Sequence, residues 1–109
     1  MKRSSKVDDD LQKEFSLNGS GLRFVLVKSA SELVQRDMDR FFAAYARFPQ
    51  GNTVPEDNGK TLRAAVEAGW IAEPQLSVGD VDNLKPGHVR WYARCIDQVI
   101  TKAREIPNA

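Results

Sequence analysis

The most informative stretch of this 109-residue chain runs from Lys85 to Pro107. Pro86 suits the first turn of a helix and Pro107 ends one, because proline lacks the N–H that an interior turn needs. Between the two prolines the apolar side chains recur at helical spacing: Val89, Tyr92, Ala93, Ile96, Val99, Ile100 and Ala103. The spacing predicts an amphipathic helix whose apolar side packs on the rest of one small domain.

Trp91 lies on the polar side of this predicted helix, roughly 140° from the centre of the apolar stripe. Its neighbours there are Arg94, Gln98 and Lys102, with Arg90 at the edge. Tryptophan beside arginine is typical of the residues that contribute most to a protein interface. These five residues are therefore the candidate protein-binding residues.

Three explanations for Trp91 are open. Another segment of the chain covers the ring, either the N-terminal hairpin or the connection of residues 70–84. Alternatively, Trp91 is an exposed anchor for another protein or is buried between subunits. In the third explanation Trp91 stacks on a nucleic-acid base beside Arg90 and Arg94.

The sequence Asn18-Gly19-Ser20-Gly21 separates two short runs that contain apolar residues. Glycine and asparagine supply the positive φ angles of a tight reversal, so residues 14–27 are predicted to form a β-hairpin. In its second strand, Leu22–Val27, Leu22, Phe24 and Leu26 share one face. A lone hairpin is marginally stable in water, so helices are expected to cover it.

A first helix is predicted after Ser29 and Glu32, which have the spacing of a capping box. Phe42 widens its apolar stripe, and Pro49 and Gly51 end it. The stripe consists of Val34, Met38, Phe41, Tyr45 and Phe48.

A second helix is expected to start at another capping box, Thr53 to Glu56, and to run to about Ala68. Gly69 is placed to terminate it in a left-handed conformation. Trp70 then folds back as a core residue at the helix end.

A short helical turn is predicted within residues 77–84, and Asn83 is a candidate cap for the last helix. The predicted fold is therefore α+β: an N-terminal β-hairpin packed against three main helices plus one short helix. Residues 1–13 are charged and poor in aromatics, which predicts a disordered tail before a single domain of residues 14–109.

Composition limits the function classes. The net charge is +1, which gives no long-range field for nucleic acid or an anionic membrane. Apolar runs are too short to span a bilayer. Cys95 is the only cysteine, so no intramolecular disulfide can form, and a lone thiol suits a reducing, cytoplasmic location.

No catalytic or metal-binding constellation is predicted. His88 and Cys95 lie about 10 Å apart along the helix axis, beyond the reach of a catalytic dyad. A single histidine and a single cysteine do not make a zinc site without recruited carboxylates. We therefore expect a non-enzymatic protein with no cofactor.

Charge is unevenly distributed along the chain. Residues 51–83 carry two basic and six acidic side chains, whereas residues 84–109 carry five basic and two acidic ones. The two segments either attract each other within the fold or form patches that orient a partner or a neighbouring subunit.

Several short motifs in residues 58–108 carry a family resemblance: Ala68-Gly69-Trp70-Ile71, Glu73-Pro74, Asp80 to Pro86, Val89-Arg90-Trp91 and Ile106-Pro107-Asn108. This part of the chain resembles small proteins of tailed phages and prophages, some of which are similar to tail-assembly chaperones. The resemblance implies a protein-binding assembly factor that keeps another virion protein soluble in the host cytoplasm. It assigns no binding residue. The alternatives are a small nucleic-acid-associated regulator and a structural subunit that self-associates.

Overall fold

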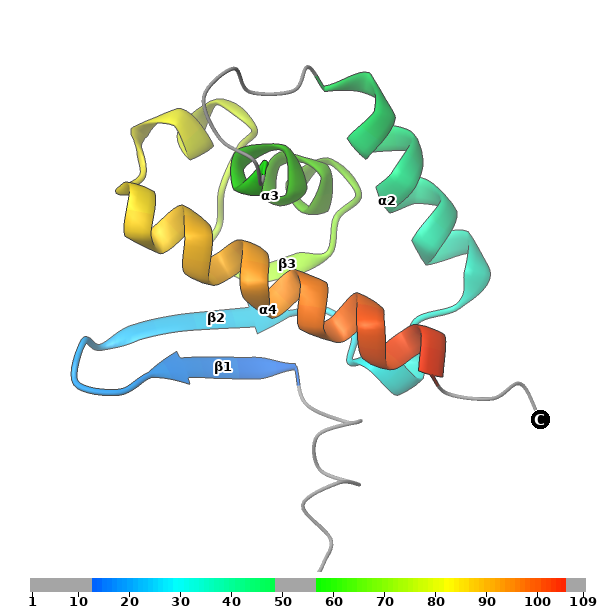
Figure 1. Cartoon of the computed structure of the whole chain (residues 1–109), viewed down its shortest axis with the longest axis horizontal. Helices are drawn as coiled ribbons and strands as arrows, with labels where there is room; N and C mark the ends of the chain where they lie inside the picture. Colours follow the sequence, from blue (N-terminus) through cyan, green and yellow to red (C-terminus); the bar gives the residue numbers. More distant parts are fainter. Residues whose placement is uncertain (1–12, 49–56, 106–109) are drawn as a thin grey trace, which may run out of the picture.

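A computed structural model describes residues 13–48 and 57–105 (Figure 1). Three strands form one antiparallel sheet in the order β1-β2-β3, and three longer helices gather on one side of it. The predicted α+β class is confirmed. None of the helices in the described ranges is long and apolar enough to cross a membrane.

The N-terminal hairpin has the predicted position. β1 (Glu14–Leu17) pairs with β2 (Leu22–Leu26), and Leu17 lies opposite Leu22. Gly19 and Gly21 have φ angles of 79° and 74°, which side chains with a Cβ rarely adopt. The Leu26 N–H also donates to the Lys13 carbonyl, so pairing extends one residue before β1. The rest of the predicted tail lies outside the described residues.

A third strand was not predicted. β3 (Ile71–Glu73) pairs with the far edge of β2, and the Val27 N–H donates to the Trp70 carbonyl at 2.8 Å. Three residues are too few to show an alternating pattern, so no strand was predicted here. On the uncovered face, the Arg23 guanidinium joins the outer strands by bonding Glu14 at 3.1 Å and Glu73 at 3.0 Å.

The first predicted helix begins later than its capping box suggests. Ser29 and Glu32 do interact, since the Ser29 N–H donates to the Glu32 carboxylate at 2.9 Å. They enclose only a short 3-10 helix, η1 (Ala30–Glu32), and α2 (Gln35–Arg47) starts three residues after it. Val34 therefore lies at the N-cap of α2 rather than in the buried stripe, and its side chain is 55% exposed.

α3 (Asn58–Glu67) begins at a cap that was not predicted. The Asp57 carboxylate accepts a hydrogen bond from the Lys60 N–H at 3.0 Å, while the predicted box of residues 53–56 lies outside the described residues. The helix ends as predicted. Gly69 has a φ of 76°, and the Trp70 N–H donates back to the Ala65 carbonyl, which is a Schellman ending.

α4 (Pro86–Glu105) follows a short 3-10 helix, η2 (Gly79–Asn83). Asn83 is the last residue of η2, so the prediction that it caps α4 is wrong. The short helix and the proline in the first turn of α4 are confirmed. α4 lies across the face of the sheet, and α3 packs between it and α2 (Figure 1).

The core lies between α4, α3 and the sheet. Phe24 is fully buried and stacks on Tyr92 with ring centroids 4.7 Å apart. Trp70 is buried as predicted and stacks on Phe41 of α2 at 4.8 Å. These two aromatic pairs connect the sheet to α4 and the end of α3 to α2.

Candidate protein-binding surfaces

Trp91 is held by the N-terminal hairpin. Its ring is half-buried and meets Phe24 of β2 edge-on, with centroids 6.4 Å apart and a 64° angle between planes. It also lies 5.5 Å from the ring of Tyr92. Of the three explanations for this residue, the structure supports cover by another segment of the same chain.

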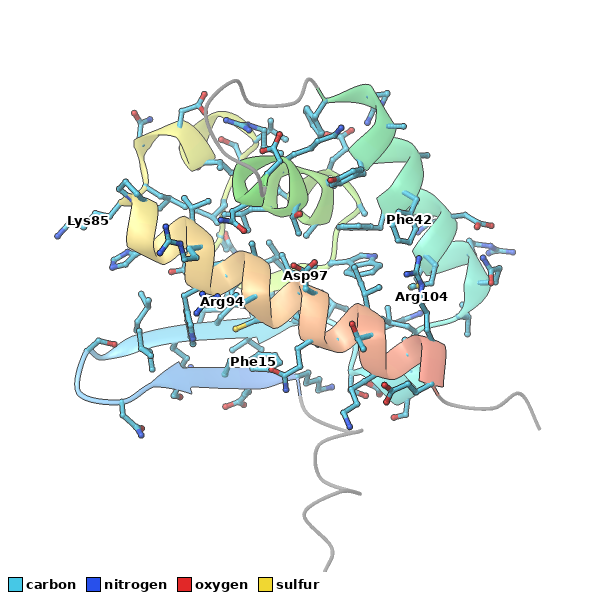
Figure 2. The ribbon with its side chains drawn as sticks, viewed as in Figure 1. Phe15, Phe42, Lys85, Arg94, Asp97 and Arg104 are labelled. Carbon is cyan, nitrogen blue, oxygen red and sulfur yellow. The ribbon has the colours of Figure 1, made fainter. Side chains whose placement is uncertain are left out.

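The other predicted binding residues form a polar stripe along α4. Arg90, Arg94 and Gln98 are exposed and Lys102 is half-buried. Figure 2 labels Arg94 and Asp97 on successive turns of α4. Because the Trp91 ring packs on the hairpin, the stripe offers charge and hydrogen bonds with little free aromatic surface.

A second surface lies between α2 and α4. A hollow of about 520 Å³ opens where the start of α2 approaches the end of α4. It is lined by Leu33, Val34, Gln35, Met38, Phe42, Ala103 and Arg104. A neighbouring hollow of about 300 Å³ continues along the two helices. It is lined by Phe41, Phe42, Tyr45, Thr61, Asp97, Ile100, Thr101 and Arg104.

Phe42 and Arg104 line both hollows and stand between them. Their side chains point toward one another from α2 and α4 (Figure 2), and the guanidinium carbon lies 5.0 Å from the ring centroid. We call the two hollows together the α2–α4 groove. The groove exists because both helices pack on α3 and not closely on each other.

Exposed apolar side chains concentrate at this groove. Among the described residues, four large hydrophobic side chains are exposed, and two of them line it: Val34 at 55% and Phe42 at 37%. The other two, Leu17 at 42% and Val27 at 50%, belong to the hairpin region. Single exposed apolar residues are ordinary, but a pair flanking a hollow marks a candidate interaction site.

Two cations near the groove rest on aromatic rings. Arg104 lines both hollows, whereas Lys60 lines neither and contacts Tyr45 at the edge of the second. The Lys60 ammonium lies 4.4 Å from the centroid of Tyr45, and Arg104 covers Phe42. Within residues 13–48 and 57–105, no carboxylate lies within salt-bridge distance of either cation. Asp97 lines the second hollow and already has an interaction of its own. The groove therefore combines apolar walls with the side chains of Arg104 and Asp97, and Lys60 lies at its edge.

The residues considered for catalysis do not meet. Cys95 is buried, and burial raises the pKa of its thiol to about 12, which leaves it protonated and unreactive near neutral pH. His88 faces the ring of Tyr92 at 6.4 Å instead. The described part of the chain holds no group of three or more histidine, cysteine or acidic side chains placed to bind a metal ion.

The groove was not predicted from the sequence, although one signal for it was present. Adjacent Phe41 and Phe42 point 100° apart on a helix, so a single packing face cannot bury both. Phe41 is buried and Phe42 is exposed. No sequence signal placed Arg104 opposite Phe42, since that contact depends on how two distant helices cross.

Comparison of the chain with protein-family models, with curated proteins and with solved structures finds no match. The resemblance to phage and prophage proteins therefore stays a prediction.

Proposed function

We propose that this chain is a non-enzymatic, protein-binding assembly factor that works in the host cytoplasm. In line with the resemblance to tail-assembly chaperones, its partner would be another virion protein. The surface that best serves this role is the α2–α4 groove, with the polar stripe of Arg90, Arg94, Gln98 and Lys102 as a flank.

One observation carries the proposal: two large apolar side chains that line a hollow stay exposed to solvent. Phe42 presents an aromatic ring at the centre of the groove. Val34 occupies the N-cap of α2, a position where serine, threonine, asparagine or aspartate would stabilise the helix. Both residues are poor choices for folding alone and good choices for an apolar partner.

The proposal is tested by affinity capture with the tagged full-length chain in the cells that naturally produce it. We compare the wild type with Phe42→Gln and with Leu17→Gln, whose original side chains are 37% and 42% exposed. A virion protein should be enriched by the wild type and by Leu17→Gln, and lost with Phe42→Gln.

Two results would contradict the proposal. Equal capture by all three proteins would exclude the groove as the binding site. A stable homo-oligomer in light scattering that dissociates with Phe42→Gln would show that the groove joins copies of this chain, which favours a structural subunit over an assembly factor.

A further inference from the structure

We infer that the α2–α4 groove receives an amphipathic helix whose apolar side chains fill the two hollows and whose carboxylates pair with Arg104 in the groove and Lys60 at its edge. The inference rests on the proposed function and goes further by naming the chemistry of the partner segment.

The shape of the groove carries the first part of the inference. On the α2 side its wall is formed by Val34, Met38, Phe42 and Tyr45, at steps of four, four and three residues. At 1.5 Å per residue these positions span about 16 Å, or three helical turns. A helix lying along this wall presents its own apolar residues at the same spacing, as helices bound in grooves do.

The opposite wall has the same helical periodicity. α4 contributes Asp97, Ile100, Thr101 and Arg104, and these positions are separated by three, one and three residues. Both walls are thus helix surfaces, and no strand edge borders either hollow. An extended peptide would find no backbone groups to pair with, whereas a helix satisfies its own and needs only side-chain contacts.

Charge carries the second part. Arg104 and Lys60 hold their charges on the faces of Phe42 and Tyr45, and a cation so placed keeps N–H groups available for a carboxylate. Asp97 has an interaction of its own, and Asp39 accepts a hydrogen bond from Gln35 at 2.9 Å. Among the described residues no salt bridge involves Arg104 or Lys60, so glutamate or aspartate beside the partner's apolar residues would complement these two cations.

The test uses two synthetic helical peptides of about 15 residues, near the length at which isolated helices begin to form. Both carry leucines at the spacing of the groove wall; one has glutamates beside the leucines and the other has lysines. Binding to the full-length chain is followed by fluorescence anisotropy at physiological salt. We expect the glutamate peptide to bind about five-fold more tightly, the upper range for a partly exposed ion pair.

Charge-reversal variants test whether Arg104 causes the preference for the glutamate peptide. Arg104→Glu should remove or invert the preference for the glutamate peptide. Arg36→Glu changes the net charge equally, but Arg36 is exposed on α2 and does not line the groove, so the preference should remain. If Arg104→Glu fails to fold by circular dichroism, Lys60→Gln is measured in its place and should weaken the preference.

The inference is overturned if the lysine peptide binds equally well or better, or if Arg36→Glu abolishes the preference as Arg104→Glu does. Other results would contradict the proposed function rather than this inference. If Phe42→Gln leaves capture of the cellular partner intact, the groove is not the binding surface. If capture needs Phe42 but the lysine peptide is preferred, the function stands and only the partner's charge is wrong.

Discussion

Replacing Trp91 with alanine decides between a packing role and a free interface anchor. Complete truncation of a buried aromatic side chain costs about 3–5 kcal/mol. Trp91 is half-buried, with one edge-on contact to Phe24 and one tilted contact to Tyr92. We therefore expect Trp91→Ala to lower the free energy of unfolding by about 2 kcal/mol, around half of the fully buried value.

A double-mutant cycle measures how much of the stability lost in Trp91→Ala comes from the contact with Phe24. The edge-on pair should contribute about 0.5–1.5 kcal/mol beyond burial. Trp91→Ala and Phe24→Leu should consequently be non-additive by about that amount, since each removes the same contact. Gln98→Ala on the exposed side of α4 serves as the control and should change stability by less than about 0.5 kcal/mol.

The assay is urea unfolding followed by circular dichroism, with a thermal melt beside it. For a domain of this size about 2 kcal/mol corresponds to a fall in Tm of roughly 8 °C. The reasoning is refuted if Trp91→Ala behaves like Gln98→Ala and shows no coupling to Phe24→Leu. The hairpin would then not hold the ring in solution, and Trp91 would again be a candidate anchor for a partner.

Three further predictions concern the fold. Gly69→Ala should destabilise the chain by about 1–2 kcal/mol in urea unfolding, because φ at this position is 76°. The Cys95 thiol, buried with a pKa of about 12, should resist a thiol reagent at pH 8 until the chain is unfolded. Burial opposes ionisation of Asp37, but hydrogen bonds from the Val34 N–H and from Lys28 outweigh it and lower the pKa of the carboxyl group. The stabilisation from ionised Asp37 is thus present above its unfolded pKa, about 3.9, and is lost as the pH falls through the lower folded value. Asp37→Asn should show a smaller loss of stability between pH 7 and pH 3 than the wild type.

Local patterns predicted the hairpin, the end of α3 and nearly all of α4. Gly19 and Gly21 fix a reversal, Gly69 fixes a helix end, and Pro86 fixes a helix start. β3 escaped prediction because its three residues become a strand only through pairing with β2. The start of α2 was misplaced because the capping box at Ser29 closes one turn of 3-10 helix and the chain then extends again before Gln35.

The groove could not be predicted for a related reason. Its two walls are α2 and α4, which are separated in sequence by α3, β3 and η2. Their spacing is set by packing on α3, so the meeting of Phe42 with Arg104 is a tertiary property. Trp91 illustrates the converse. Its polar neighbours left three explanations open, and the position of the hairpin shows that Phe24 contacts the ring.

Val34 provides the strictest test of whether the groove is shaped by binding. Its side chain cannot accept a hydrogen bond, so at the N-cap only half of a capping box forms: the Asp37 carboxylate accepts the Val34 N–H at 2.9 Å. Val34→Ser supplies the missing acceptor and should raise the free energy of unfolding by about 0.5–1 kcal/mol. The same change should weaken partner binding, because it removes an exposed apolar wall of the groove.

Val27→Ser is the matched control, since Val27 is similarly exposed but caps no helix, and it should neither stabilise the chain nor affect binding. A loss of stability above about 1 kcal/mol in Val34→Ser would mean that Val34 packs within the fold, and a gain without loss of binding would remove it from the site. Higher stability with weaker binding is the result expected if this valine is retained for a partner at the expense of the helix.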